Sequence, residues 1–299
     1  MNYEPQNKKV AILGATGMLG SAVYSVLKDK YDLILTVRES AKIELLEKAY
    51  GGTESHQVIE FDAGKAYQDF LSKKGYPGEY LNSFLSRIES ADWVINAIGI
   101  TIPFSLENEA LTFFINSALP HLLARELGDK LIHITTDCSF SGLGGAPYDE
   151  HSPKTPVDLY GLSKSLGEPT NCLTLRTSII GRELGGFTGL LEWFLRQKEP
   201  KVNGFTNHLW NGITTKEFGH ICDKLISGEV ARPGPGIYHV FSTEVTKYEM
   251  LRKFQEKYNL PVEIEEFTAP VAIDRRLVTI SDFNARLKIP SFGDMVNEL

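Results

Sequence analysis

Short apolar runs alternate with longer segments of helical periodicity through the first half of the chain. The apolar runs are continuous rather than alternating, which is typical of parallel strands covered by helices on both faces of a sheet. We expect such strands at Lys9–Leu13, Leu33–Val37, Val58–Phe61, Trp93–Ile98, Leu131–Thr135 and Leu173–Arg176. Helices are expected between them at Gly17–Lys28, Ala110–Leu127 and Tyr160–Gly167. This order predicts an α/β fold built on a doubly wound parallel sheet of the Rossmann type.

Two stretches depart from this regular alternation. The stretch Ala63–Ala91 is longer than a usual crossover, and we expect a helix, a turn and a second helix there, with the turn at Gly75, Pro77 and Gly78. From position 181 onward, glycines, aromatic residues and short helical segments predict a smaller lobe, with a strand at Ile237–Val240. We therefore expect a Rossmann domain at residues 1–180 and a lobe at 181–299, and the chain can cross between the two.

Composition narrows the classes of partner. With 31 basic and 38 acidic residues the net charge is −7, and no block of lysine and arginine could follow a nucleic-acid backbone, so we expect no nucleic-acid partner. No apolar run approaches the ~18 residues of a membrane span, and the polar start is unlike a signal peptide, so we expect a cytoplasmic protein with no membrane contact. Three scattered cysteines and seven histidines without close pairing predict neither a disulfide framework nor a metal site.

Three glycines, Gly14, Gly17 and Gly20, separate the first expected strand from the first expected helix. In this context the first glycine permits a tight turn, the second lets the backbone approach a pyrophosphate, and the third lets the helix pack closely on the strand. The positive end of the helix would face the negative charge. A glycine-rich turn without a ligand is the alternative, but the strand before it and the helix after it favour a dinucleotide site.

The ends of the next strands bear on which dinucleotide is bound. An enzyme that prefers NAD usually has an acid at the end of the second strand, for the ribose 2′-hydroxyl. This chain has Arg38 there, which could pair with a 2′-phosphate or be a solvated surface residue. We therefore expect NADPH, with NADH as the alternative. Asp62 after the third strand could meet the adenine or only cap a helix, and the small residues that end the fourth strand leave room for the cofactor: Ala97, Ile98 and Gly99.

Tyr160 and Lys164 lie four positions apart, on adjacent turns of one expected helix face. A lysine ammonium beside the tyrosine would stabilise the tyrosinate and lower a phenol pKa of about 10, which gives a general acid for a carbonyl that accepts hydride. Thr136 ends an apolar run and could hold the same carbonyl oxygen, although a helix cap is the common role of such a threonine. Asp137 either binds substrate or only orders the loop. Asn116 could support the lysine through water or lie on a polar helix face.

Together these motifs resemble those of the extended short-chain dehydrogenases/reductases, and more narrowly those of the dTDP-4-dehydrorhamnose reductase family. The glycine cradle and the segments 136–142, 160–168 and 175–177 carry the resemblance strongly, and Gly212-Ile-Thr214 carries it weakly. It implies NADPH-dependent reduction of a 4-keto-6-deoxy sugar on a nucleotide carrier, in deoxysugar biosynthesis. The oligomeric state is left open, and a homodimer is one assembly that the resemblance allows. The resemblance implies Thr136, Tyr160 and Lys164 as catalytic residues. It also implies pyrophosphate contacts at Gly14, Thr16, Gly17, Met18 and Leu19, and nicotinamide contacts at Thr177 and Ser178.

Departures from the family pattern concern the substrate side. The family's Tyr-Val-Phe-Asp-Gly is Cys138-Ser-Phe-Ser-Gly142 here, and the proline of Gly-x-Pro-Thr is missing at Gly212-Ile-Thr214. These changes leave the chemistry intact but put the identity of the sugar in doubt. Candidate substrate contacts are Asp137, Cys138, Trp210 and Arg275. Trp210 could stack on a base or lie in a core. Arg275, next to Arg276, could pair with a diphosphate or be a surface residue.

Two other functions compete with the reductase. An epimerase or 4,6-dehydratase of the same superfamily would keep its cofactor, typically NAD, through the cycle. A dehydratase also needs an acid where this chain has Cys138, which argues against elimination. A catalytically silent binding or regulatory subunit on the same fold would commonly lose Tyr160 or Lys164, and this chain keeps both.

Overall fold

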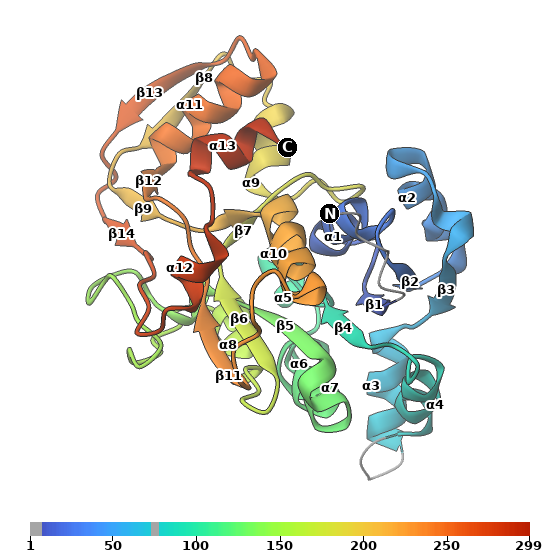
Figure 1. The fold of residues 1–299 in the computed structure, drawn as a ribbon. Coiled ribbons are helices and arrows are strands. Elements are labelled where there is room, and N and C mark those ends of the chain that lie inside the picture. The colour runs from blue at the N-terminus through green and yellow to red at the C-terminus, as the bar shows by residue number, and fades with distance from the viewer. Residues whose placement is uncertain (1–7, 73–77) are drawn as a thin grey trace.

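The computed structural model describes residues 8–72 and 78–299, and a seven-stranded parallel sheet forms its centre (Figure 1). The strand order β3-β2-β1-β4-β5-β6 is that of a doubly wound Rossmann sheet, with β11 added beside β6, so the predicted fold class is confirmed. The strands, from one edge to the other, are β11 (Gly236–His239), β6 (Leu173–Thr177), β5 (Leu131–Thr136), β4 (Trp93–Asn96), β1 (Lys9–Leu13), β2 (Asp32–Val37) and β3 (Gln57–Glu60).

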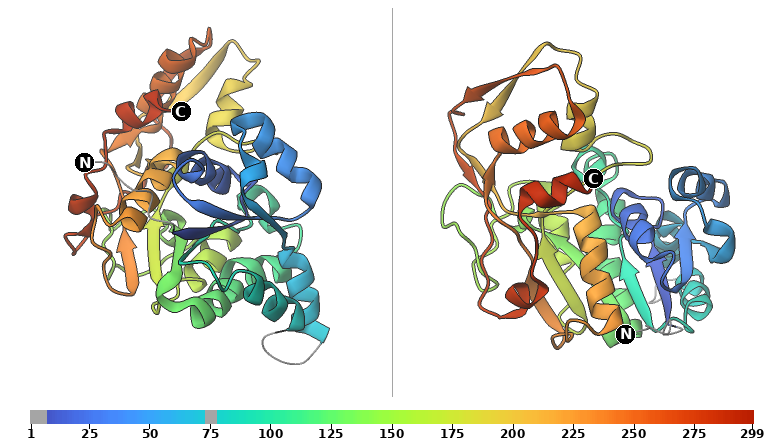
Figure 2. Two further views of the ribbon diagram at one scale, coloured as in Figure 1. Left: turned by 45° about the vertical axis from the view of Figure 1, so that its right-hand side comes forward. Right: turned by 45° about the horizontal axis from the view of Figure 1, so that its top comes forward.

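Helices cover both faces of this sheet, and each face has its own hydrophobic core (Figure 2). On one face, α1 (Met18–Leu27) and α10 (Thr215–Ser227) lie side by side. On the other face lie α3 (Ala63–Ser72), α4 (Glu79–Arg87) and α7 (Leu119–Leu127). Burial on both sides explains why the strands read as continuous apolar runs in the sequence.

Several element boundaries match the expectations and others move by a residue or two. The first strand lies at Lys9–Leu13 as predicted, and the third begins one residue early. The strand expected to reach Ile98 ends at Asn96 instead. After the strand, the Asn96 side chain accepts a hydrogen bond from the backbone N–H of Ile98 at 3.1 Å. The residues that follow are therefore free to form the loop at the strand's carboxyl end.

The single helix expected at Ala110–Leu127 is interrupted. It begins as α6 (Glu109–Phe113), widens into a π-helical turn at Phe114–Ala118 and continues as α7. Such a turn accommodates one extra residue and often occurs at functional sites. Its central residue here is Asn116, which is fully buried.

The long crossover before β4 contains two helices, α3 and α4, as predicted. Gly78 is the N-cap of α4. The other two residues of the expected turn, Gly75 and Pro77, lie outside the described residues.

The C-terminal part of the chain forms a smaller lobe, at the upper left of Figure 1, and also returns to the main sheet through α10 and β11. In the lobe, β8 (Lys201–Phe205) pairs with β13 (Glu263–Phe267), and β9 (His208–Trp210) lies between β12 (Val245–Thr246) and β14 (Ile273–Asp274). The remaining elements are α2 (Ile43–Tyr50), α5 (Ile102–Ser105), α8 (Leu159–Leu166), β7 (Ile179–Ile180), α9 (Leu190–Leu195), β10 (Ile213–Thr214), α11 (Lys247–Tyr258), α12 (Phe283–Leu287) and α13 (Phe292–Asn297).

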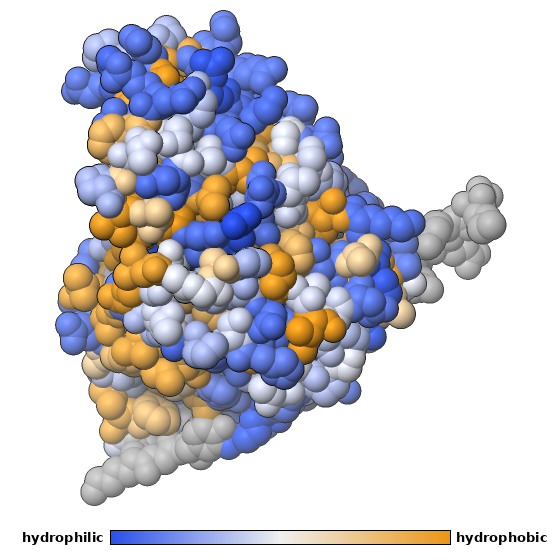
Figure 3. Space-filling view, turned by 90° about the vertical axis from the view of Figure 1, so that its left-hand side faces the viewer, coloured by the Kyte–Doolittle hydropathy of each residue, from blue (hydrophilic) through white to orange (hydrophobic). Residues whose placement is uncertain are grey.

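The surface on the left-hand side of Figure 1 is unevenly polar. Figure 3 shows that the upper part, which belongs to the lobe, is mostly hydrophilic, whereas hydrophobic side chains gather lower down and along one edge. Among the helices of residues 8–72 and 78–299, none combines the length and the apolar character that crossing a membrane requires.

Candidate functional site

The turn between β1 and α1 has the geometry of a phosphate cradle. Gly14 adopts φ +78°, a left-handed conformation that favours glycine. Its N–H donates to the Thr36 hydroxyl at 2.9 Å, and its carbonyl accepts from the N–H of Gly17 at 3.0 Å. A Cβ on Gly20 would collide with the Gly14 carbonyl, so α1 can approach the strand this closely only with glycine there.

The start of α1 fits a pyrophosphate. Its N-cap, Gly17, is exposed and makes no side-chain cap, and the first turn has no acidic residue, so the unpaired N–H groups are left for a ligand. Thr16 and Met18 are half-buried beside it. The Leu19 side chain is buried in the hydrophobic core, so only its backbone could face a phosphate.

The loops after β2, β3 and β4 also lie where the sequence places them. Arg38 is exposed immediately after β2, and among the described residues its guanidinium has no ion pair. The Asp62 carboxylate accepts from the N–H of Gly64 at 2.8 Å, which makes it a cap at the start of α3. The loop after β4 contacts the cradle: a Cβ on Gly14 would lie 3.2 Å from Ile98 and 3.4 Å from the Ala97 carbonyl oxygen. Gly99 is exposed in the same loop.

The three predicted catalytic residues, Thr136, Tyr160 and Lys164, lie near the carboxyl end of β5, and we call them the trio. Thr136 is the last residue of the strand, and its hydroxyl accepts from the N–H of Cys138 at 3.1 Å and donates to Asp137 at 3.2 Å. The same hydroxyl lies beside the phenol of Tyr160, in the first turn of α8, and acts to lower the pKa of that phenol. Thr136 therefore caps the turn after β5 and contacts the tyrosine at the same time.

The structure does not show the expected lowering of the Tyr160 pKa by Lys164. Burial raises the pKa of Tyr160 well above its usual value, and the nearby Cys138 raises it further. The Lys164 ammonium points instead to the Ile134 carbonyl, to which it donates at 2.8 Å. Burial lowers the pKa of Lys164 to about 8. At neutral pH the tyrosine is thus a protonated phenol, which can donate a proton.

Asp137 and the residues at the end of β6 lie beside the trio. Asp137 is buried, and burial raises the pKa of its carboxyl, although the positive charge of Arg275 and a hydrogen bond with Ser178 act against the rise. Thr177 is buried at the end of β6, and Ser178 follows it half-buried. The structure therefore brings Asp137, Thr177 and Ser178 to the same edge of the sheet as Thr136.

The four predicted substrate contacts are not all together. Arg275 Nη1 lies 3.6 Å from the Cys138 sulfur, which places both beside Asp137. Burial raises the pKa of the Cys138 thiol to about 12, so it is no nucleophile at neutral pH. Trp210 packs edge-on against Phe292, with 5.4 Å between ring centroids, which favours the interpretation as a core residue.

A buried ion pair that the sequence analysis did not single out holds the helix of Tyr160 and Lys164. Glu168, just after α8, forms two hydrogen bonds with Arg176 of β6, at 2.9 and 2.7 Å, and Arg176 also donates to His239 of β11 at 2.7 Å. Asn116 donates to Ser163 of α8 at 3.1 Å and accepts from the N–H of Ile100 at 2.8 Å. In the sequence, Glu168 and Arg176 both lie in segments that carry the family resemblance, 160–168 and 175–177. Two opposite charges in these segments were the signal that could have revealed the ion pair.

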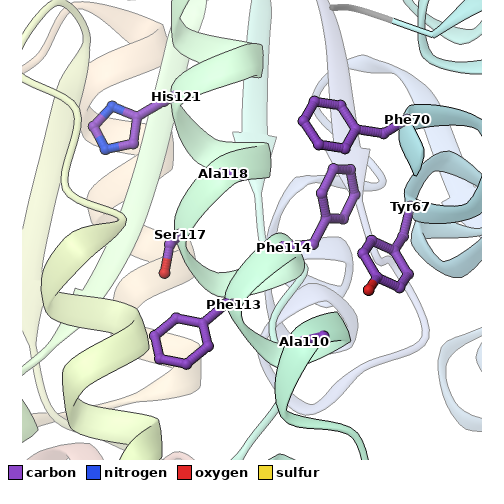
Figure 4. Close-up of a pocket in the computed structure, with 8 residues that line it drawn as sticks. All are labelled: Tyr67, Phe70, Ala110, Phe113, Phe114, Ser117, Ala118 and His121. Atoms are coloured by element: carbon purple, nitrogen blue, oxygen red, sulfur yellow. The ribbon is translucent and has the colours of Figure 1, made fainter. Parts of the chain in front are cut away.

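A surface pocket of about 410 Å³ lies away from the trio, between α3 and the π-helical turn. Figure 4 shows Tyr67, Phe70 and Phe114 facing one another there. Apart from Ser117 and His121 its lining is apolar or aromatic. Within residues 8–72 and 78–299, no three side chains of the metal-binding types gather into a cluster.

Comparison with known proteins identifies the family and two relatives. The family model described as RmlD substrate binding domain matches residues 8–276. The spore coat polysaccharide biosynthesis protein SpsK of Bacillus subtilis is 30% identical over 188 residues, 59% of this chain and 65% of the relative, just under two thirds of its length. Methionine adenosyltransferase 2 subunit beta of Xenopus tropicalis is 26% identical over 271 residues, 85% of this chain and 73% of the relative.

Two solved structures share the fold. A dTDP-4-dehydrorhamnose reductase from Bacillus anthracis, in complex with NADP, has a TM-score of 0.69 at 19% identity and covers 98% of each chain. The enzyme WbmG of Bordetella bronchiseptica, in complex with NAD and UDP, has a TM-score of 0.66 at 18% identity, covering 99% of this chain and 94% of the other. At these identities the likeness shows the fold.

The buried ion pair makes stability depend on pH. The pKa of Glu168 is lowered although burial acts to raise it, because Arg176 and Lys154 favour the carboxylate. A carboxyl group whose pKa is lowered by folding stabilises the fold at pH values above its unfolded pKa, near 4.5. This contribution is lost as the pH falls through the pKa of the folded state. Glu168→Gln should reduce the free energy of unfolding at pH 7 by about 3–5 kcal/mol, because it leaves Arg176 buried without its counter-charge.

Urea unfolding at pH 7 and at a series of lower pH values measures both effects. Exposed Glu256→Gln on α11 is the matched control and should change little. A Glu168→Gln variant as stable as the unmodified protein at pH 7 would contradict this role.

Proposed function

The chain belongs to the RmlD substrate binding domain family, and on this premise we propose that it is an NADPH-dependent reductase of a nucleotide-linked 4-keto-6-deoxy sugar. The observation that carries the proposal is the placement of the Thr136 hydroxyl beside the Tyr160 phenol at the carboxyl end of β5. The cradle of Gly14 and Gly17 lies at the same edge of the sheet, two strands away. Open α/β sheets bind their ligands along this edge.

In the proposed reaction, a dinucleotide held by the cradle would supply a hydride to the sugar's C4 carbonyl carbon. Tyr160, a protonated phenol at neutral pH, gives its proton to the carbonyl oxygen, and Thr136 holds that oxygen by a hydrogen bond. Lys164 is buried beneath the pair, where its ammonium would hold the cofactor's ribose and carry positive charge toward the tyrosinate that forms. Proton and hydride together convert the ketone to an alcohol.

The residues at the cradle support a dinucleotide cofactor. The pyrophosphate would lie against Gly14, Thr16 and Gly17 and the backbone of Met18 and Leu19. Exposed Arg38, without an ion pair among the described residues, would take a 2′-phosphate, which supports NADPH, and NADH is the alternative. Ala97, Ile98 and Gly99 would line the ribose, Asp62 would lie near the adenine, and Thr177 and Ser178 would lie near the nicotinamide.

On the substrate side, we propose that the lobe after residue 180 mainly binds the nucleotide sugar. Asp137, Cys138 and Arg275 cluster beside the trio, which supports a role in substrate contact. Trp210 is half-buried and packs against the hydrophobic core, so a stacking role has less support.

A second candidate is a non-catalytic subunit on the same fold. The 26% identity over 85% of this chain to a protein named as a subunit beta favours considering it. The retention of Thr136, Tyr160 and Lys164 together at the carboxyl end of β5 supports the enzyme instead, because the reduction of a carbonyl needs a proton donor placed in this way. Turnover of any 4-keto sugar nucleotide would exclude the silent subunit.

Cofactor choice tests the role of Arg38. NADPH should bind more tightly than NADH, because the guanidinium pairs with the 2′-phosphate. Arg38→Asp should narrow or invert the preference, as measured by fluorescence titration with both nucleotides. Arg87→Asp, on α4, is the control and should leave the ratio unchanged. Tighter binding of NADH by the unmodified protein would contradict the argument from Arg38.

The proton donor is tested by Tyr160→Phe, which removes the hydroxyl and keeps the ring. Turnover should fall by roughly 10²–10⁴, the usual contribution of general acid catalysis, while NADPH binding remains. Lys164→Ala should reduce both turnover and cofactor affinity. Near-normal turnover by Tyr160→Phe would mean that the tyrosine and lysine only form a helix face.

The fate of the hydride separates a reductase from an epimerase or dehydratase. A reductase releases oxidised cofactor after each turnover, so the protein should purify largely free of nucleotide and consume NADPH one-for-one with the 4-keto sugar nucleotide. Deuterium from labelled NADPH should appear at C4 of the product, detected by mass spectrometry and NMR. Tightly retained NAD, with product formed and no net oxidation of nicotinamide, would contradict the reductase and leave the Thr136–Tyr160–Lys164 site standing.

A further inference from the structure

A chain of hydrogen bonds connects the loop after β4 to the end of α8 through β5. The Oδ1 atom of Asn96, at the end of β4, accepts from the N–H of Ile98 at 3.1 Å. Because that oxygen is occupied, the amide NH₂ faces the His133 ring and donates to its Nδ1 at 3.1 Å. The ring Nε2 donates in turn to the carbonyl of Gly167, directly after α8, at 3.0 Å. Both side chains are buried, and we call Asn96 and His133 the buried link.

The buried link requires a neutral histidine. A proton on Nδ1 of His133 would face the Asn96 NH₂ group, which has no lone pair to accept it. Burial lowers the pKa of His133 well below its usual value, and the positive charge of Lys164 lowers it further. At neutral pH the ring therefore carries its proton on Nε2, and both of its nitrogens are hydrogen-bonded.

One end of the buried link is the loop at residues 97–100. This loop packs against Gly14 of the phosphate cradle. It is held a second time at Ile100, whose N–H and carbonyl bond to the Asn116 amide at 2.8 and 2.9 Å. The same amide donates to Ser163 of α8 at 3.1 Å. Loop and helix are thus connected at both ends of the loop.

The other end of the buried link is the helix that carries Tyr160 and Lys164. The N–H of Gly167 donates to the Lys164 carbonyl at 3.1 Å, so the residue that His133 holds is bonded to the last turn of α8. The Lys164 ammonium donates to the carbonyl of Ile134, the next residue of β5 after the histidine. Two neighbouring residues of β5 therefore fix the same end of the helix.

Reduction of a carbonyl needs two groups from different parts of this chain to meet. A hydride would come from a dinucleotide held at the cradle and the loop 97–100, and a proton would come from Tyr160 on α8. The buried link joins these two parts. Resting on the proposed function, we propose that Asn96 and His133 are positioning residues that set the place of the cofactor loop relative to the proton donor. They act through the loop and the helix, and not by contact with the substrate.

Kinetics of the full-length protein with NADPH and a 4-keto sugar nucleotide test this role. His133→Leu removes both hydrogen bonds of the ring, and Asn96→Ala breaks the link at its other residue. Each should lower kcat roughly 10- to 100-fold, because a misplacement of about 1 Å has an effect of this size. The Kd for NADPH should change little, because the cradle is intact. His133→Gln, whose amide offers one acceptor and one donor, should recover most of the lost kcat.

The matched control is Leu46→Ala, which removes a fully buried side chain from α2, the helix after β2. It should lower Tm through the cavity that it leaves, without lowering the kcat of the folded protein. Thermal unfolding of every variant shows that folded protein is assayed. If His133→Leu and Asn96→Ala behave like this control, with a lower Tm and an unchanged kcat, the two residues are only structural and the positioning role is overturned.

Fluorine NMR of protein labelled with fluorotyrosine reports on Tyr160 without turnover. Its signal is identified by its loss in Tyr160→Phe. We expect NADPH to shift this signal to one sharp line in the unmodified protein, and to a broad or divided line in His133→Leu and Asn96→Ala. The positioning role would be contradicted by identical lines in the three proteins, or by no shift on adding NADPH to the unmodified protein.

The two readouts separate this inference from the reductase proposal. If no 4-keto sugar nucleotide consumes NADPH but the Tyr160 line broadens in the variants, the positioning of Tyr160 by the buried link stands and the reductase is wrong. If the unmodified protein turns over and both link variants keep its kcat, the reductase stands and the positioning role is wrong.

Discussion

The close seating of helix α8 is the constraint on which the candidate site depends. A Cβ on Gly161 would collide with the Cys138 carbonyl, and one on Gly167 would collide with the Asn116 carbonyl. The helix is thus pressed against the turn after β5 at one end and against the π-helical turn at the other. His133 of β5 holds the second end, because its ring bonds to the Gly167 carbonyl at 3.0 Å. This seating is what brings the Tyr160 phenol to the Thr136 hydroxyl.

The close packing of α8 buries several polar groups, and these groups differ in the partners that compensate for their burial. Glu168 and Arg176 neutralise each other behind the helix, so this buried pair is satisfied by charge and by hydrogen bonds. Lys164 donates to a backbone carbonyl, and Asp137 is buried with hydroxyl partners. Burial lowers the pKa of the first and raises that of the second. Opposite shifts of this kind in one cluster are common where a fold keeps groups ready for proton transfer or ligand charge.

Sequence periodicity predicted the sheet well because its strands are buried on both faces. The spacing of the glycines predicted the turn after β1, because each glycine there has a distinct steric role. The π-helical turn at Asn116 was missed, since an inserted residue leaves the apolar pattern of a helix nearly intact. The small lobe's two-residue strands carry too few positions for any period to appear. Arg275 and Arg276 are indistinguishable in sequence, and only the acids around Arg276 separate them. The pKa of Tyr160 could not be predicted either, because it depends on where the Lys164 ammonium points.

The structure separates the parts that would do chemistry from the parts that would choose the substrate. Thr136, Tyr160 and Lys164 belong to β5 and α8, which the seated glycines and the Glu168–Arg176 pair hold rigidly to the main sheet. Arg275 comes from the lobe and contacts the turn after Thr136 at Cys138 and Phe140. The chain departs from its family's motif at Cys138, where the lobe meets the sheet. A change there would leave the proton donor in place, because the close-packed glycines and the Glu168–Arg176 pair hold α8 to the main sheet.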